Sequence, residues 1–591
     1  MSEIWLTSIQ IQGYRSFGPK QEFFFPDKGY NKPIAIVGYN NCGKTNLMNA
    51  IRYGIGDKFI SHNTFSIKDI HNLMHENSIE IQTNLVASEY EAFDYKGNPF
   101  HKSIGGLHTV TTEVEDLEIK AKCKPSFFGA NKHYNIFYVN FHNIKDEIST
   151  KKTSWGNLTS FLAKHIQKLV ETDEKMIAKK EQFKKETRAA TTAILENSKI
   201  KEFIASIKSN YSQNLRNNNC EVQFVLPDYE DVFLQMVFKI GLNDNMDDLI
   251  PIDHFGDGYI SMFVMAVIQA IAETETEDKC LFLFEEPESF LHENHQEYFY
   301  KMVLCQLASK GHQVIYTTHS DKMVDIFDTQ GIIRLEYDEE RKCTVNKYNK
   351  VADFHPDIDS TYGGLREPVR LANFNSFIKS VEPNLNKILF SKKVVLLEGP
   401  NDLMVYRYAL EHQLKRIGNE ESFTKAYLNF LNISFITHHG KLTALLLVEI
   451  CNHFGLDYFL VNDWDLPTGN PEGLREFKSL DDLKGSDTYT VSNGEPSSRA
   501  HKVAINANWQ LLKAAKNGQI HFNIPKLEAV VGYEKDDKSS LGIWEKLLNI
   551  EEFQEELFPK HLQHFLEVPE KAEEQIQVDD QDVDWLDDMF L

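Results

Sequence analysis

Residues 34–51 constrain the fold of this chain more than any other stretch. The apolar run at residues 34–37 predicts a buried strand, and residues 46–51 predict a helix. The loop between them reads Gly-Tyr-Asn-Asn-Cys-Gly-Lys-Thr. Two glycines let backbone N–H groups surround a phosphate, the lysine reaches the β- and γ-phosphates, and the hydroxyl is a ligand for Mg²⁺. Strand, loop and helix in this order predict a P-loop, whose nucleotide-binding residues are Gly38, Asn40, Asn41, Gly43, Lys44 and Thr45, with Thr45 also a metal ligand.

Length and composition limit the class of protein. A chain of 591 residues is too long for one core and predicts two to four domains. It contains no run of eighteen uncharged apolar residues, and its first residues lack a basic region followed by an apolar one. We therefore expect a soluble, cytoplasmic protein with no membrane partner. The seven cysteines form no CxxC pair, which argues against a disulfide framework and against a zinc site.

The charge distribution leaves nucleic-acid binding open. The formal net charge is -24, but residues 542–591 hold fifteen Asp and Glu against three Lys and Arg, half of the excess. Residues 161–220 are the most basic long stretch, with twelve Lys and Arg against seven Asp and Glu. Two interpretations of that stretch stay open: a solvated helix face, or an arm that faces DNA or a second subunit.

The first part of the chain predicts a mixed α/β domain with inserted helices. Alternating apolar residues predict a strand within residues 4–17 that ends in a turn at Gly13, and β-branched and aromatic residues predict further strands at 78–86, 106–114, 133–141 and 220–226. Apolar residues at helical spacing in 158–170 and 200–211 predict two long inserted helices.

Three further segments of this part have residues that suit ATP chemistry. Residues 281–284 are an apolar strand followed by Glu285 and Glu286. We expect Glu285 to lie in the ligand shell of Mg²⁺ and Glu286 to polarise the attacking water. Glu285 stands where such segments usually carry Asp, and its longer side chain reaches further. Gly258 opens a helix to about residue 272, either as a γ-phosphate contact across a dimer or as a simple helix cap. His319 ends the strand at 314–318 and is expected to sense the γ-phosphate.

A second α/β part follows a loose, turn-rich stretch at 337–383. The strand 392–397 leads to Glu398 and Asp402, and the strand 457–462 leads to Asp463 and Asp465, with a helix, a strand and a helix in between. Acids at the carboxyl ends of parallel strands meet at one edge of a sheet. Carboxylates crowded together repel one another unless a divalent cation lies among them. Metal-assisted phosphodiester cleavage needs this arrangement.

These motifs carry a family resemblance. The opening strand, the Tyr-Arg-Ser-Phe turn and the P-loop resemble the ATP-binding-cassette heads of chromosome-maintenance proteins, and Glu-Gly-x-x-Asp followed by Asp-x-Asp resembles the Toprim domain. Together they resemble the OLD (overcoming lysogenization defect) nucleases, which include the Gabija nuclease and retron-associated effectors. The resemblance implies that Mg²⁺ or Mn²⁺ is bound by Glu398, Asp402, Asp463 and Asp465. It also implies a late acid and a late lysine, for which Glu528 and Lys538, preferred over Lys535, are the candidates.

The resulting prediction is an α/β protein with an ABC-type ATPase head and a C-terminal Toprim domain. The function that we predict is metal-dependent DNA cleavage gated by ATP, in defence against phage. The alternative is an ATP-driven DNA-binding or maintenance protein without nuclease activity. The family implies a homodimer or higher oligomer and a companion helicase, or a reverse transcriptase with its RNA. The predicted segments are 1–150 and 216–345 for the ATPase, 151–215 for the helical insert, 346–390 for a linker, 391–560 for Toprim, and 561–591 for an acidic tail that is either disordered or a docking peptide.

Overall fold

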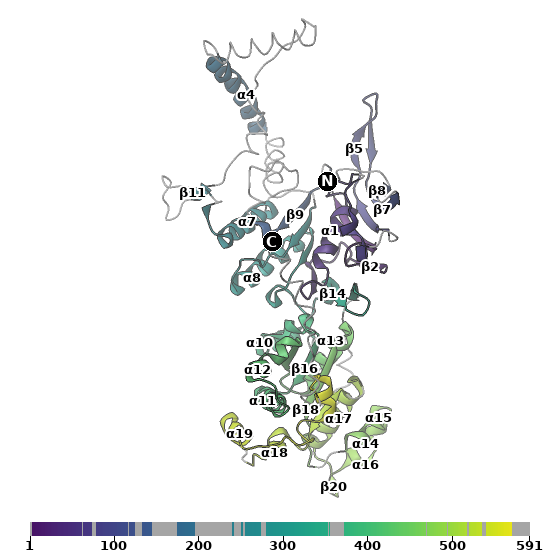
Figure 1. Cartoon of the computed structure of the whole chain (residues 1–591), viewed down its shortest axis with the longest axis vertical. Coiled ribbons are helices and arrows are strands. Elements are labelled where there is room, and N and C mark those ends of the chain that lie inside the picture. The colour runs from purple at the N-terminus through teal and green to yellow at the C-terminus, as the bar shows by residue number, and fades with distance from the viewer. Residues whose placement is uncertain are drawn as a thin grey trace. The chain divides into compact units, whose positions relative to one another are not determined.

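The computed structural model divides the chain into two compact units (Figure 1). The first comprises Met1–Val324 and Gly331–Val351, and the second Asp325–Gln330 and Ala352–Leu591. The structure describes residues 3–61, 63–73, 78–115, 118–124, 130, 133–144, 174–195, 239–240, 250–251, 254–273, 279–352, 354, 371–467, 470–492, 494–516, 519–534 and 539–569. The finer division into six segments stays a prediction.

A six-stranded sheet holds the P-loop of the first unit. Its order is β15-β14-β3-β13-β12-β9, and every neighbouring pair is parallel except β14 and β15. The strands are β3 (Ile34–Gly38), β9 (Ile136–Asn140), β12 (Leu281–Glu285), β13 (Gln313–Thr317), β14 (Ile332–Asp338) and β15 (Cys343–Tyr348). All residues of β3, β12 and β13 are buried, as apolar central strands of a parallel sheet must be. The loops after these three strands therefore lie along one edge of the sheet.

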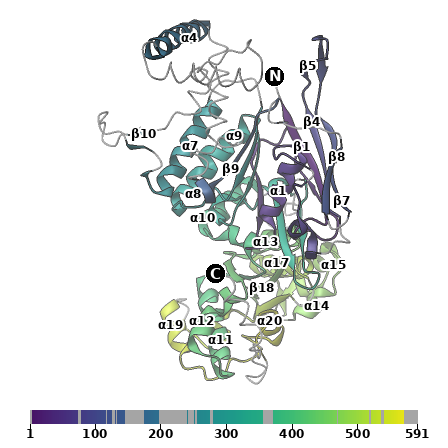
Figure 2. The same cartoon turned by 45° about the horizontal axis from the view of Figure 1, so that its top comes forward.

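An antiparallel sheet of five strands completes the core of this unit. Its order is β2-β1-β4-β7-β8, formed by β1 (Ile4–Gln12), β2 (Gln21–Phe24), β4 (Glu80–Ala87), β7 (Gly106–Glu115) and β8 (Glu118–Lys124). Helix α1 (Lys44–Gly54) lies between the two sheets (Figure 2), and one hydrophobic core joins residues from both sheets and the helix. The hairpin β5 (Tyr90–Phe93) and β6 (Pro99–Lys102) extends from the antiparallel sheet.

Besides α1, the α-helices that the structure describes in the first unit are α4 (Glu174–Leu195), α7 (Asp257–Glu273), α8 (Glu293–Phe299) and α9 (Cys305–Ser309). In Figure 2, α7, α8 and α9 lie on the side of the mixed sheet that faces away from α1. Helix α4 falls between the two inserted helices predicted at 158–170 and 200–211, which lie outside the described residues, as does the strand predicted at 220–226. A short ladder pairs β10 (Lys239–Ile240) with β11 (Ile250–Pro251).

The second unit is built on a four-stranded, all-parallel sheet. Its order is β17-β16-β18-β21, formed by β16 (Lys393–Leu397), β17 (Ile433–Thr437), β18 (Asp457–Asp463) and β21 (Ile520–Asn523). The crossovers contain α11 (Pro400–Arg416), α12 (Glu421–Phe430), α13 (Lys441–Phe454) and α17 (Arg499–Ala514). Because all four strands run the same way, the residues that follow β16, β18 and β21 meet at one edge.

Short elements complete this unit. They are α10 (Leu371–Val381), α14 (Pro471–Arg475), α15 (Leu480–Lys484), α16 (Asp487–Thr490), α18 (Leu527–Val531), α19 (Ser540–Leu547), α20 (Lys560–Phe565) and the ladder of β19 (Val491–Ser492) with β20 (Glu495–Pro496). The acidic residues 579–591 lie outside the described part of the chain. Among the helices that the structure describes, none is long and apolar enough to cross a membrane.

Candidate functional sites: a phosphate loop and a carboxylate cluster

The loop after β3 has a conformation that only glycine allows at two positions. Gly38 and Gly43 have φ angles of 150° and 97°. A Cβ on Gly38 would lie 2.4 Å from the Leu335 carbonyl oxygen, and one on Gly43 would lie 2.4 Å from Thr344 Oγ1. Thr344 Oγ1 in turn donates to the Cys42 carbonyl at 2.9 Å. Strands β14 and β15 therefore support this loop from behind, and a side chain at either glycine would displace it.

Lys44 begins α1 and folds back over the loop. Its buried Nζ atom donates to the carbonyl oxygens of Gly38 at 2.9 Å and Tyr39 at 2.7 Å, and lies 3.4 Å from His319 Nδ1. Burial lowers the pKa of Lys44. An ammonium held inside a loop of backbone groups is arranged to meet phosphate oxygens.

Strand β13, which pairs with β3, and strand β12, which pairs with β13, bring a histidine and an acid to the same place. Glu286 Oε1 lies 3.5 Å from His319 Nε2, and the Glu286 amide donates to Thr317 Oγ1 at 3.1 Å. The hydrogen bond from His319 lowers the pKa of the Glu286 carboxyl. The His319 amide donates to Glu288 Oε1 at 2.5 Å, and burial raises the pKa of Glu288. The structure thus places Lys44, His319 and Glu286 together at the loop edge of the sheet.

The other residues predicted for this site take separate positions. Glu285 is buried at the end of β12, where its Oε2 accepts from Tyr138 OH at 2.5 Å and Asn140 Nδ2 at 3.5 Å. Gly258 lies in the first turn of α7, where a Cβ would be 3.1 Å from the Phe290 carbonyl oxygen. The side chains of Asn40, Asn41 and Thr45 are exposed. Tyr138 and Asn140 belong to no motif, and the only sequence signal near them was the strand predicted at 133–141.

In the second unit, two acids lie near the end of β16. Glu398 follows the strand directly, and Asp402 lies in the helix that comes next. Glu398 Oε2 accepts from Asn462 Nδ2 at 3.0 Å and from the Asp463 amide at 3.1 Å, which ties it to the end of β18. Asp402 lies in the first turn of α11, is buried, and accepts from the Gly399 amide at 3.1 Å through Oδ2. The first turn of a helix favours a negative charge.

Asp463 ends β18 among these acids. Its Oδ1 accepts from the Leu527 amide at 2.9 Å and from Asn523 Nδ2 at 3.3 Å. Burial, with a further contribution from the charge of Glu398, raises the pKa of Asp463 to about 7. Burial and the charges of Asp463 and Glu398 raise the pKa of Asp402 well above its usual range. The three carboxylates therefore repel one another in the cation-free protein.

The oxygen atoms of this cluster suit a hard divalent cation. Asp402 Oδ1 and Glu528 Oε2 are buried and, among the residues that the structure describes, have no hydrogen-bond donor. Both Asp402 and Glu528 are under a tenth exposed. Carboxylate oxygens are the ligands that Mg²⁺ and Mn²⁺ prefer. In the described parts of the chain, no three Asp, Glu, His or Cys side chains are already positioned to hold a metal ion. Binding would therefore require these carboxylates to rotate toward the cation.

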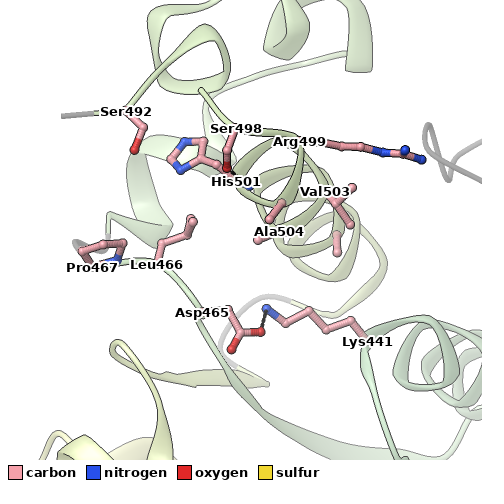
Figure 3. A pocket seen from close by; sticks show the side chains of 12 residues that line it. Lys441, Asp465, Leu466, Pro467, Ser492, Ser498, Arg499, His501, Val503 and Ala504 are labelled. Atoms are coloured by element: carbon pink, nitrogen blue, oxygen red, sulfur yellow. Dashed lines mark hydrogen bonds and ion pairs between the residues drawn. The ribbon is translucent and has the colours of Figure 1, made fainter. Parts of the chain in front are cut away.

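Asp465 lies at the rim of this cluster, beside an open pocket. Its φ angle is 64°, and its amide donates to the Pro525 carbonyl at 2.8 Å, which holds it beyond the end of β18. Its Oδ2 lies 2.7 Å from Lys441 Nζ. Figure 3 shows this pair at one side of a pocket of about 780 Å³, which is also lined by Leu466, Pro467 and the first turn of α17. Lys538 lies outside the described residues.

Sequence reasoning missed several residues that organise this edge. Asn462 and Asn523 donate to the carboxylates of Glu398 and Asp463, and Asn523 itself accepts from the buried Tyr406 hydroxyl at 2.7 Å. Strand β21, which carries Asn523, was not predicted. A run of four residues, Ile-His-Phe-Asn, gives too short a pattern to identify a strand from periodicity.

Comparisons with known proteins find relatives of both domains. Residues 5–324 match the family described as AAA ATPase domain, and residues 389–465 match the Overcoming lysogenization defect protein-like, TOPRIM domain. Endonuclease GajA of Bacillus cereus (strain VD045) is 22% identical over 492 residues, 78% of this chain and 75% of the relative. The OLD nuclease of Thermus scotoductus is 24% identical over 463 residues, 73% of this chain and 78% of the relative.

The Old nuclease of Escherichia phage P2 is 23% identical over 497 residues, 78% of this chain and 77% of the relative. The predicted α/β fold, with an ATPase domain followed by a Toprim domain, is confirmed. The match over residues 5–324, more than half of the chain, shows that the protein belongs to the AAA ATPase domain family; an OLD-like TOPRIM domain follows, and the chain is similar to nucleases of the OLD kind over most of its length.

Proposed function

We propose that this protein is an ATP-binding, metal-dependent DNA endonuclease that cleaves phosphodiester bonds at its Toprim site. The observation that carries the proposal is the cluster of Glu398, Asp402 and Asp463 at one edge of the second sheet, where burial and mutual repulsion raise the pKa values of both aspartates. Such a cluster is costly without a cation and becomes favourable with one. The similarity to proteins named as nucleases supports the same activity.

In this proposal the cation is held by Glu398, Asp463 and Asp465, with Asp402 and Glu528 completing its surroundings. A bound Mg²⁺ or Mn²⁺ would activate water and stabilise charge on the phosphate that is attacked. The protein's own contribution is to fix the ligands. The amides of Asp463 and Leu527 and the side-chain amides of Asn462 and Asn523 orient the two acids that follow β16 and end β18.

The ATPase domain is proposed to regulate this cleavage. Lys44 contacts the phosphates of ATP, Glu286 orients the attacking water, and His319 lies between them with its two ring nitrogens 3.4 Å from Lys44 and 3.5 Å from Glu286. A histidine in this position is sensitive to the loss of the γ-phosphate. Glu285 and Thr45 are the proposed ligands of the Mg²⁺ that accompanies ATP. Gly258 is proposed to contact the γ-phosphate of the ATP that is bound by a second subunit.

We also propose where the protein acts, how it assembles and which companion it works with. The protein acts in the cytoplasm as a homodimer or larger assembly, in defence against phage. It works with a companion of the kind associated with Gabija or with retrons, a helicase or a reverse transcriptase with its RNA. Lys538 is the proposed late lysine of the Toprim site.

The test is cleavage of supercoiled and linear DNA with Mg²⁺ or Mn²⁺, with and without ATP, by the wild-type protein and by Asp463→Asn. Cleavage by the wild type alone supports the Toprim site as the catalyst, and the comparison with ATP gives the sign of the regulation. ATP binding and DNA binding without cleavage, under every condition and with a candidate companion added, would favour the maintenance-protein alternative.

A further inference from the structure

The ion pair between Lys441 and Asp465 joins a proposed metal ligand to a lysine in the wall of the same pocket. Lys441 Nζ is 2.7 Å from Asp465 Oδ2 and 3.3 Å from the Trp464 carbonyl oxygen. The Lys441 side chain is 12% exposed, whereas that of Asp465 is 51% exposed. An acid of the proposed metal site is therefore neutralised by a nearly buried ammonium group that belongs to the protein itself.

The position of Lys441 at the start of its helix is unfavourable unless a negatively charged group offsets the charge of the ammonium. Lys441 is the first residue of α13, a helix of fourteen residues whose first turn contains no acid. The positive end of the helix dipole repels a cation there, at a cost of roughly 0.3–1 kcal/mol. The backbone at Asp465 is also unusual, because a non-glycine residue with a φ angle of 64° is uncommon. Both residues thus occupy positions that local structure alone disfavours, and they meet each other.

The surroundings leave space for a substrate. The pocket of about 780 Å³ has Lys441 and Asp465 on one side and, on another, Arg499 and His501 of α17 with Ser498, the N-cap of that helix (Figure 3). The Asp465 carboxylate and the Lys441 ammonium face each other across a short gap in Figure 3, while the Arg499 side chain extends away from them. Lys441 is therefore the cation nearest to the proposed metal ligands among the residues that line this pocket.

We propose that Lys441 takes the place of the metal at Asp465 in the cation-free protein, and contacts a DNA phosphate in the pocket once a metal has bound. The inference rests on the proposed function. When a divalent cation binds Asp465, its charge repels the ammonium and it competes for the carboxylate that held Lys441, so the ammonium is released. A released lysine at the pocket wall is a donor for a phosphate oxygen next to the bond that is cut. The ion pair thus couples metal binding to substrate binding.

If Lys441 has this role, removing its charge should strengthen metal binding and weaken DNA binding. Lys441→Gln removes the competing ammonium, so the nucleotide-free protein should bind Mn²⁺ about five-fold more tightly, the size of a weak ion pair. The same variant should bind a DNA duplex about ten-fold more weakly in the presence of Ca²⁺, because a charged phosphate contact is lost. In EDTA, where Lys441 is held by Asp465, DNA affinity should stay within about two-fold of wild type.

The experiment uses the full chain and a matched control. Lys425→Gln removes the same charge from an exposed ion pair, Lys425 with Glu421 at 2.8 Å on α12, away from the pocket. Free Mn²⁺ is followed by electron paramagnetic resonance without nucleotide, and DNA binding by fluorescence anisotropy, with intact DNA verified on gels. Lys441→Arg keeps the charge and should restore DNA binding with Ca²⁺. The control variant should match wild type in every assay.

The outcomes separate this inference from the proposed function. Lys441→Gln that binds Mn²⁺ no more tightly than wild type, or that binds DNA equally well with Ca²⁺, overturns the inference while leaving metal-dependent cleavage intact. A loss of both Mn²⁺ and DNA affinity, with a lowered unfolding temperature, assigns Lys441 a purely structural role and also overturns it. A wild-type protein whose Mn²⁺ binding is absent, or is unchanged in Asp463→Asn, overturns the proposed function and the inference together.

Discussion

Asp463→Asn should stabilise the cation-free protein at pH 8. Asp463 is only 8% exposed, and its pKa rises from 3.8 to about 7 in the folded chain. Between these two values the unfolded carboxyl is ionised while the folded one stays protonated, so stability falls as pH rises through this window. Above pH 7 the loss is complete and amounts to about 4 kcal/mol, at 1.36 kcal/mol for each unit of pKa. Asparagine resembles the neutral form and keeps an acceptor for the Leu527 amide.

The assay is calorimetric unfolding of the full chain in EDTA, at pH 8 and at pH 5. At pH 8 the variant's unfolding midpoint for the second unit should exceed that of wild type by roughly 10 °C, since 1 kcal/mol corresponds to about 2–4 °C in a unit of this size. At pH 5 wild-type Asp463 is protonated in the folded chain, and the difference should fall below half. Added Mn²⁺ should raise the midpoint of wild type and leave the variant unchanged. A variant that is equally or less stable than wild type at both pH values would refute the claim that burial and the charge of Glu398 disfavour the ionised form of Asp463.

Three further predictions concern the two sites. Lys44→Ala should weaken binding of a fluorescent ATP analogue at least ten-fold, because a charged phosphate contact is lost, and unchanged affinity would remove Lys44 from the phosphate site. Gly43→Ala should lower the free energy of unfolding by about 2 kcal/mol or more and impair ATP binding, because the new Cβ would lie 2.4 Å from Thr344 Oγ1. The control in thermal unfolding is Gly29→Ala, whose new Cβ would have none of the described atoms within 4 Å. The affinity for Mn²⁺, measured by titration, should fall about ten-fold for each pH unit below 7, because Asp463 must lose its proton to bind metal; a flat profile from pH 5 to pH 7 would contradict this.

The sequence predicted those parts of the sites that local motifs encode. A P-loop is a contiguous stretch whose strand, turn and helix are all readable, and the structure has β3, the loop and α1 in that order. The acids after β16 and β18 were expected to converge because parallel strands end at a common edge, and Glu398 and Asp463 are indeed joined by a hydrogen bond between the Glu398 carboxylate and the Asp463 amide.

Residues that act from a distance along the chain could not be predicted. Tyr138 bonds to Glu285 across 147 positions, because β9 pairs with β12 in the sheet, and no periodicity reveals that pairing. Asn523 reaches Asp463 only because β21 joins the edge of the sheet beside β18. Lys441 belongs to no motif that the sequence revealed, and its ion pair with Asp465 is seen only in the tertiary structure.

The most direct test of the account is to locate Mn²⁺ in the protein by anomalous X-ray diffraction, from crystals grown without nucleotide. We expect an anomalous peak within coordination distance of Glu398, Asp463 and Asp465, which disappears in Asp463→Asn. A wild-type protein that cleaves DNA with Mn²⁺ but shows no anomalous peak at these carboxylates, or shows its peak elsewhere, would contradict the central claim that this cluster is the metal site of the nuclease.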